Sequence, residues 1–260
     1  MKTKRSAIVT VCVLCILLTG LLCAKPAYYL YRDITFSREE HSAEAWEVKH
    51  YAESQNLSIG HWPWEIIALY ENNPETKEFV LNYPFWEEIS VDITSYSAET
   101  VPLFLQWDPM WGYEDYGSSC IAVTGCGPTC LAMVGYYLTG DPNMTPNKIA
   151  QFSERNGYYE KGYGSSWTLI SKGTEKLGLT ATELPLVKSK MIKALEEGTP
   201  IILALGKGDF TSSGHYIVLT GLEESAFRVN DPNSVIRSEK LWTYEELEGQ
   251  IRNIWAIGKA

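Results

Sequence analysis

From about Val101 onward, the chain changes from an aromatic, acidic sequence to one in which helix-like segments precede strand-like segments. We expect helices at residues 125–138, 165–177, 189–197 and 243–251, and strands at residues 201–205, 216–221, 227–230 and 253–257. Helices first and an antiparallel sheet second are typical of the α+β class. The sequence therefore predicts an α+β domain over residues 99–260.

The helix expected at residues 125–138 begins at a cysteine. Cys126 is flanked by two glycines, Pro128 falls in the first turn, and Gly140 follows the last turn. A thiol at a helix start lies near unsatisfied N–H groups at the positive end of the helix dipole, which favours the thiolate form. A small buried residue would also suit this position, but Cys130, one turn further in, fits that role better. Cys126 is therefore a candidate nucleophile.

His215 is the histidine in this half of the chain that could activate Cys126, because the other three histidines lie upstream. It directly precedes the strand expected at residues 216–221. An imidazole beside a thiol favours the thiolate and can act as an acid or a base. The alternative is an idle histidine that is hydrogen-bonded beside a strand.

The strand pairing suggests a partner for this histidine. A tight connection through residues 222–224 would place His215 directly opposite Asp231, with Cβ atoms about 5 Å apart. A bulge or a longer turn would move the partner to Asn230 or Asn233. A carboxylate in this position would fix the tautomer of the ring and stabilise its charged form.

The first residues read as an export signal. Lys2, Lys4 and Arg5 precede Ser6–Ala24, a run without charge that is rich in Leu, Val, Ile and Cys. The run is just long enough to cross a bilayer, so residues 1–24 are expected to be a signal peptide or a single-span membrane anchor. With the positive end inside, the rest of the chain is extracytoplasmic, secreted or anchored to the outer face of the cell membrane.

Residues 25–98 are expected to form a short-helix linker or collar. Helical patterns occur at residues 42–54, 65–70 and 73–80, and the Pro at 84 ends the last of them. No recognisable chemistry lies in this segment. It would either pack on the domain or serve as a spacer.

Charge and cysteine usage exclude several classes of function. The net charge is −10 and no basic cluster follows the N-terminus, which argues against a nucleic-acid partner. The exported part holds Cys120, Cys126 and Cys130, an odd number that leaves at least one free thiol. In the exported part the cysteine spacing forms no CxxC pair and residues 141–143 read as a turn, so neither a metal nor another cofactor is expected.

Four ordered motifs are similar to those of a known family. They are Leu105–Pro109 with Trp111-Gly112, Gly125–Thr129, Gly214–Val218 and Asn230–Asn233. This set resembles the C39-like cysteine peptidases, papain-fold proteins related to the peptidase domains that remove double-glycine leaders from exported peptides. The resemblance covers roughly residues 101–257, and nothing in the sequence identifies a double-glycine pocket.

The resemblance implies a role for each candidate residue. Cys126 would be the nucleophile, His215 the base, Asp231 its orienting partner and Gln106 the side-chain donor of the oxyanion hole. In papain-like enzymes this Gln lies a few residues before the Cys, whereas here it lies twenty before it, so residues 113–124 must loop out. The implied fold is papain-like, with the nucleophile at the start of a central helix packed on an antiparallel sheet that carries the His and the Asp.

The implied function is that of an extracytoplasmic cysteine peptidase. It would hydrolyse peptide bonds in peptide or protein substrates through a covalent acyl-enzyme, and it would contact the membrane if residues 1–24 are retained. The alternatives are a papain-fold cell-wall amidase or endopeptidase, a non-catalytic papain-fold binding module, and a redox role for Cys120 or Cys130. A Cys120–Cys130 bridge and three free thiols are both compatible with the sequence.

Overall fold

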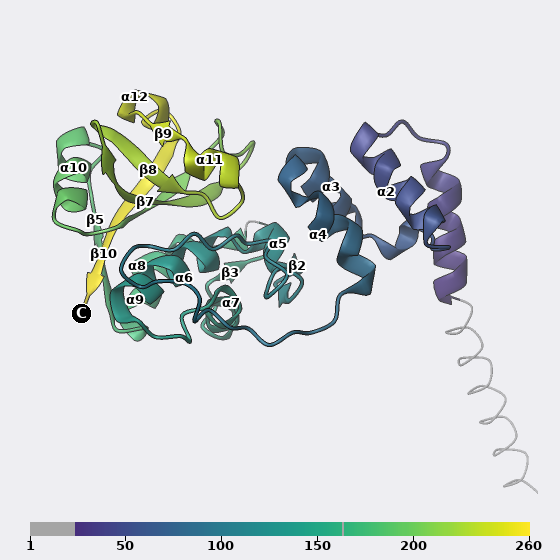
Figure 1. The fold of residues 1–260 in the computed structure, drawn as a ribbon, viewed down its shortest axis with the longest axis horizontal. Helices are drawn as coiled ribbons and strands as arrows, with labels where there is room; N and C mark the ends of the chain where they lie inside the picture. Colours follow the sequence, from purple (N-terminus) through teal and green to yellow (C-terminus); the bar gives the residue numbers. More distant parts are fainter. Residues whose placement is uncertain (1–23, 163) are drawn as a thin grey trace, which may run out of the picture. The chain divides into compact units, whose positions relative to one another are not determined.

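The computed structural model describes residues 24–162 and 164–260 (Figure 1). The chain divides into two compact units, with the boundary between Phe85 and Trp86. Of the leader expected at residues 1–24, all but Ala24 lies outside the described residues. Within residues 24–162 and 164–260, no helix combines the length and the apolar character needed to cross a membrane.

The N-terminal unit consists of short helices. They are residues 24–36, α2 (Ala43–Ser54), η1 (Ile59–His61), α3 (Trp64–Asn72), η2 (Pro74–Thr76), α4 (Lys77–Asn82) and η3 (Tyr83–Phe85). Ser42 caps α2 by accepting a hydrogen bond from the N–H of Ala45. The fully buried Trp62 donates from Nε1 to the carbonyl of Val80 at 2.7 Å, which ties the segment before α3 to α4. The sequence predicts the last three α-helices of this unit but not the helix at residues 24–36.

The second unit begins with an extended segment, residues 86–98, which is followed by the helices and the sheet. Residues 86–98, expected in the linker, belong to this unit, and Ile93 is buried in its core. The helices are α5 (Ile121–Thr124), α6 (Cys126–Thr139), α7 (Pro146–Arg155), α8 (Trp167–Ser171), α9 (Gly173–Lys176), α10 (Lys188–Glu196), α11 (Val235–Glu239) and α12 (Tyr244–Leu247). The strands are β1 (Asp115–Tyr116), β2 (Ser119–Cys120), β3 (Tyr159–Glu160), β4 (Gly164–Ser165), β5 (Leu179–Glu183), β6 (Ile201–Leu205), β7 (His215–Glu223), β8 (Ala226–Asn230), β9 (Leu241–Trp242) and β10 (Ile251–Lys259).

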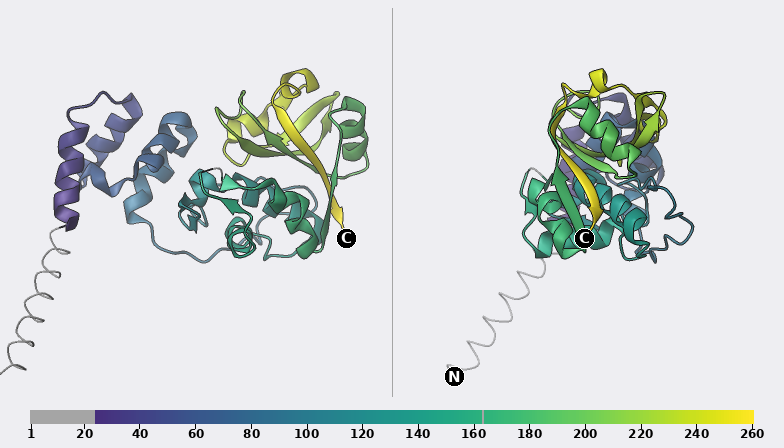
Figure 2. Two further views of the ribbon diagram at one scale, coloured as in Figure 1. Left: turned by 180° about the vertical axis from the view of Figure 1, so that it is seen from behind. Right: turned by 90° about the vertical axis from the view of Figure 1, so that its left-hand side faces the viewer.

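A six-stranded antiparallel sheet organises this unit. Its strand order is β5-β10-β6-β7-β8-β9, and β1–β2 and β3–β4 form two small hairpins outside it. Figures 1 and 2 show α6, α8 and α9 along one side of the sheet and α10 on the other side. The predicted α+β class with an antiparallel sheet is confirmed.

Both faces of the sheet are buried where α6 and α10 cover them. In β6, Ile202 and Ala204 join the core that contains Leu131 of α6, whereas Leu203 joins the core that contains Met191 of α10. Alternate residues of a strand point to opposite faces, so a strand covered on both sides must be apolar throughout. This explains the continuous apolar run at residues 201–205.

The helix expected at residues 165–177 is interrupted. Ser165 belongs to β4, and Ser166 caps α8 by accepting a hydrogen bond from the N–H of Thr168. Lys172, with φ −127° and ψ −31°, then separates α8 from α9. A strand and two short helices therefore occupy the region in which the sequence pattern predicts one helix.

The late helix expected at residues 243–251 is shorter than predicted. The capping box of Thr243 and Glu246 is present at the start of α12, as expected. The helix ends at Leu247, and Ile251 is already the first residue of β10. The pairing of Ile251 with Leu205 of β6 therefore takes the last residue that the sequence assigns to the helix.

Candidate active site

Cys126 is the first residue of α6, as the sequence predicts. Gly125 occupies the N-cap, where no side chain caps the helix, and Gly140 ends it in the left-handed conformation at φ 68°. Cys126 is half-buried and carries a free thiol. Its sulfur is thus held at the positive end of a 14-residue helix, a place that stabilises a negative charge.

His215 lies beside this cysteine. It is the first residue of β7, pairs with Leu205 of β6, and is 8% exposed. The neighbouring Cys126 side chain is one of the groups that raise the pKa of His215. Both residues line a pocket of about 420 Å³, whose other lining residues are Glu160, Ser165, Ser166, Trp167, Ala204, Leu205, Gly214 and Tyr216.

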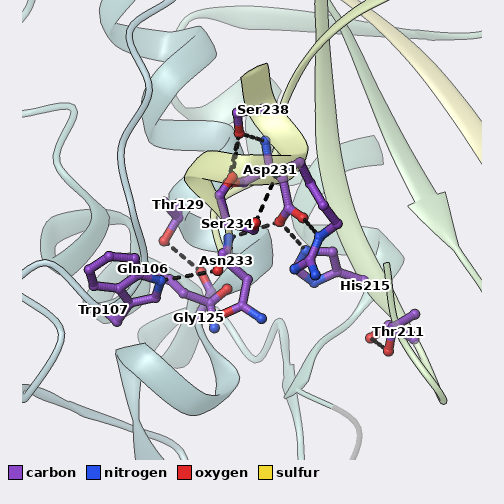
Figure 3. Close-up of polar contacts among 12 residues, drawn as sticks. Gln106, Trp107, Gly125, Thr129, Thr211, His215, Asp231, Asn233, Ser234 and Ser238 are labelled. Atoms are coloured by element: carbon purple, nitrogen blue, oxygen red, sulfur yellow. Dashed lines mark hydrogen bonds and ion pairs between the residues drawn. The ribbon is translucent and has the colours of Figure 1, made fainter. Parts of the chain in front are cut away.

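Asp231 pairs with the ring of His215 (Figure 3). The His215 Nε2 and the Asp231 Oδ1 are 2.7 Å apart, and Asp231 is fully buried. Because Nε2 faces the carboxylate, Nδ1 is the ring nitrogen left to face Cys126. The structure therefore brings together the three residues that the sequence singles out as nucleophile, base and orienting partner.

The predicted register that led to this pair is wrong. The hairpin pairs Glu223 with Ala226 through a two-residue turn whose residues both have positive φ, and a bulge interrupts the ladder between Leu219 and Gly221. The regular ladder ends where Val218 pairs with Asn230. Asp231 therefore does not lie opposite His215 in the ladder but reaches it from the segment that follows β8.

Arg237, which the sequence analysis does not identify, holds Asp231 from the other side. Its Nε donates to the Asp231 Oδ2 at 2.5 Å, while the N–H of Asn233 donates to Oδ1 at 2.8 Å. The backbone N–H of Asp231 donates to the Oγ of Ser238 at 2.9 Å. Arg237 and Ser238 lie on α11, so this short helix fixes the carboxylate (Figure 3). No residue pattern marks Arg237 in advance.

The electrostatics of the His215–Asp231 pair favour the charged form of both side chains. Burial alone would lower the pKa of His215, but the charge of Asp231, the hydrogen bond to that carboxylate and the neighbouring Cys126 side chain raise it to about 10. Burial alone would raise the pKa of Asp231, but the charges and hydrogen bonds of His215 and Arg237 lower it below its usual value. At neutral pH the ring is thus an imidazolium, the form that stabilises a neighbouring thiolate.

Gln106 contacts α5, the helix that precedes Cys126. This contact differs from the predicted one, in which the Gln106 side chain donates to the oxyanion. Its Nε2 donates to the carbonyl of Ala122, in the helix just before Cys126, at 2.6 Å. The β1–β2 hairpin loops out between Gln106 and Ala122, as the sequence requires. Gln106 is not one of the described residues that line the pocket. Its Nε2 carries a second hydrogen that the hydrogen bond to Ala122 does not use.

A tight contact holds the β4 segment against the start of α6. The Tyr116 and Ser165 hydroxyls are 2.7 Å apart, and the Tyr216 hydroxyl donates to the carbonyl of Ser165 at 3.1 Å. A Cβ added to Gly127 would lie 2.6 Å from the Cβ of Ser165. Gly127 is therefore the residue that lets this wall of the pocket approach the helix.

We expect the Gly127→Ala variant to open or distort the pocket. The clash with Ser165 forces one wall to move, which should cost about 1–3 kcal/mol of stability and slow the reaction of the Cys126 thiol. Thermal unfolding and thiol labelling would measure the two effects. The matched control is Gly249→Ala, because a Cβ there meets nothing within 4 Å. Equal stability and equal labelling rates of the two variants would contradict the tight contact between Gly127 and Ser165.

The remaining cysteines do not form the bridge considered from the sequence. Cys130 carries a free thiol and is fully buried in α6. Burial raises the pKa of its thiol, which keeps it protonated. In the part of the chain that the structure describes, no group of three or more His, Cys, Asp or Glu side chains is placed to hold a metal ion.

Comparisons with known proteins identify relatives of the second unit. The model of the Peptidase_C39 like family matches residues 98–259. The peptidase domain of Streptococcus ComA, a bi-functional ABC transporter involved in a quorum-sensing pathway, is 19% identical, with a TM-score of 0.42 over 57% of this chain and 98% of that one. A C39-like peptidase from Bacillus anthracis is 15% identical, with a TM-score of 0.37 over 62% of this chain and 96% of that one. No curated protein sequence matches the chain.

Proposed function

The chain belongs to the Peptidase_C39 like family, and we propose that it is a cysteine peptidase that uses Cys126, His215 and Asp231. The observation that carries the proposal is the position of His215, which lines one pocket with Cys126 and is held by the carboxylate of Asp231 at 2.7 Å. The basic start and the uncharged run of residues 6–24 support a reaction that takes place outside the cytoplasm.

In the first half of the reaction, the Cys126 thiolate attacks the carbonyl carbon of the peptide bond. The negative charge that develops on the carbonyl oxygen is stabilised by the backbone N–H groups at the start of α6. His215 donates its proton to the leaving amine, the C–N bond breaks, and a thioester joins the acyl group to Cys126.

In the second half, water replaces the amine. The now neutral His215 takes a proton from the water as its oxygen attacks the thioester carbon. The carboxylic acid product leaves, and Cys126 with His215 returns to the thiolate–imidazolium form. Asp231 stabilises the imidazolium in both halves, and Arg237 holds Asp231 in place.

The pH dependence of thiol labelling tests the pair without a known substrate. An isolated thiol is ionised to well under 1% at pH 6, whereas a thiolate held by an imidazolium is ionised at that pH. We expect iodoacetamide to label Cys126 at pH 6 about a hundred times faster in the wild type than in His215→Ala, and the two rates to converge toward pH 9. Peptide mass spectrometry would read the label at each cysteine.

The buried Cys130 is the internal control, because it should stay slow in both proteins. Equal labelling rates of Cys126 in the wild type and His215→Ala at pH 6 would contradict the Cys126–His215 pair on which the proposal rests. Cleavage of a synthetic peptide mixture by the wild type, and not by His215→Ala, would then extend the result from the thiol to hydrolysis.

A further inference from the structure

The pocket that holds Cys126 carries an acidic side chain with no role in the proposed chemistry. Glu160 pairs with Gly164 in the β3–β4 hairpin and lines the pocket. The next residue of that hairpin, Ser165, packs against Gly127 in the first turn of α6. The tight contact between Ser165 and Gly127 thus fixes the hairpin, and with it Glu160, relative to the nucleophile.

Glu160 also supplies the net charge of the pocket. Its carboxylate forms no hydrogen bond or ion pair with any residue in the described part of the chain, and the residue is exposed. The Cys126–His215 pair is neutral overall, whether both groups are charged or both are neutral. Asp231 lies behind the ring and is paired with Arg237. An unpaired carboxylate on an otherwise neutral lining attracts a cation.

The other walls of the pocket suit the stem of a long cationic side chain. Trp167 is 49% exposed, and the apolar Ala204, on the face of the sheet that packs against α6, lines the same pocket. Lys and Arg place their methylene groups on apolar surface while the charged end stays near water or an anion. An exposed indole face adds an attraction for such a cation.

The effect of Glu160 reaches deep into the pocket. The pKa of Tyr216, whose hydroxyl lies beneath the pocket wall, is raised mainly by burial, and the Glu160 carboxylate is among the charges that raise it further. The net charge of the chain, −10, strengthens the attraction of cations at longer range.

From these observations we infer that Glu160 selects peptides with a Lys or Arg side chain close to the cleaved bond. The inference rests on the proposed peptidase function and adds the class of substrate to it. Glu160 acts by binding the ammonium or guanidinium group of the substrate, with Trp167 against the methylene stem.

The charge at the pocket can be measured by labelling Cys126 with two small reagents of opposite charge. Aminoethyl and sulfonatoethyl methanethiosulfonate both transfer their thioalkyl group to a thiolate, forming a mixed disulfide and releasing methanesulfinate. In the full chain, the ratio of the ammonium rate to the sulfonate rate should fall about five- to tenfold in Glu160→Gln, because one unit charge affects the two rates in opposite directions. Added salt should reduce the ratio in the wild type.

The matched control is Glu175→Gln, which removes the same charge from an exposed position on α9. Its ratio should equal that of the wild type. A ratio in Glu160→Gln that does not differ from the wild type would overturn the inference. This outcome is distinct from failure of the proposed function, which would appear as Cys126 labelling that does not depend on His215.

Peptide cleavage tests the substrate class directly. In a synthetic peptide mixture, bonds cut by the wild type should be enriched in Lys or Arg within two residues, and Glu160→Gln should lose this enrichment while still cutting other peptides. Cleavage by the wild type without enrichment would also overturn the inference. If the wild type cut no peptide, the proposed function would fail, and the ratio of labelling rates would still decide whether Glu160 sets the charge of the pocket.

Discussion

Replacing Cys126 with alanine should abolish peptide hydrolysis, with a fall in kcat/KM of about 10⁴-fold or more. In the proposed mechanism the thiolate of Cys126 forms the covalent bond to the substrate, and alanine has no group that can replace it. The half-buried side chain loses one sulfur atom, and the helix around it should remain intact. Cleavage rates on a peptide mixture, together with circular dichroism and thermal unfolding, would check both statements.

The matched control for this variant is Cys130→Ala, one turn further along α6. Cys130 is fully buried in the core, so this change should cost about 1–2 kcal/mol of stability and leave cleavage largely unchanged. If Cys126→Ala kept its activity while folded, the nucleophile would have to be sought elsewhere.

The second large effect is expected for Asp231→Asn. The amide cannot stabilise the imidazolium, so kcat/KM should fall about a hundredfold or more. Arg237 is left partly buried without a counter-charge, which should lower stability by about 3 kcal/mol and the unfolding temperature by about 6–12 °C. Activity assays and calorimetry would measure the two losses.

The difference in stability between the wild type and Asp231→Asn should depend on pH. The pKa of Asp231 is lowered by folding, so its contribution is present above about 3.8 and is lost as the pH falls below that value. The pKa of His215 is raised from 6.5 to about 10, so the contribution of the imidazolium is complete below pH 6.5 and is lost as the pH rises toward 10. The gap in unfolding temperature between wild type and variant should be widest between about pH 4 and 6.5.

The exposed Asp115 offers a control for the chemical change itself. Asp115→Asn removes the same charge from the β1–β2 hairpin, and its unfolding temperature should follow that of the wild type at every pH. A gap for Asp231→Asn that widens from pH 6.5 to pH 10 would contradict the assigned direction of the His215 shift.

The position of Cys126 at the start of a helix could be predicted from the sequence because it depends on local signals. Helix start, first-turn proline and terminal glycine all lie within 15 residues of Cys126, and α6 follows them closely. The strand at residues 201–205 was equally clear, since a sheet covered on both faces demands an unbroken apolar run. The match of the family model to residues 98–259 confirms the resemblance that the four motifs suggest.

The contact of His215 with Asp231 was expected for a reason that the structure does not support. The bulge near Gly221 and the two-residue turn changed the register, and neither has a signal strong enough to be read in advance. The contact exists because Arg237 and Ser238 on α11 hold Asp231. Such tertiary support depends on residues that lie together only in the folded chain.

Other errors have the same origin. The helix predicted over residues 165–177 starts late because Ser165 pairs in the β3–β4 hairpin, and Lys172 divides the rest into α8 and α9. The sequence analysis did not predict α7, although Pro146 stands at its start. In the first case tertiary contacts overrode the local helix pattern, and in the second the polar surface of the helix obscured it.

The position of β10 within the sheet has a consequence for synthesis of the chain. This strand lies between β5 and β6, although both precede it by many residues. Until residues 251–259 have left the ribosome, β5 has no neighbour in the sheet, and one edge of the apolar β6 stays open. The unit can therefore complete its core only after translation of this region, and its nascent chain must be kept from aggregating until then.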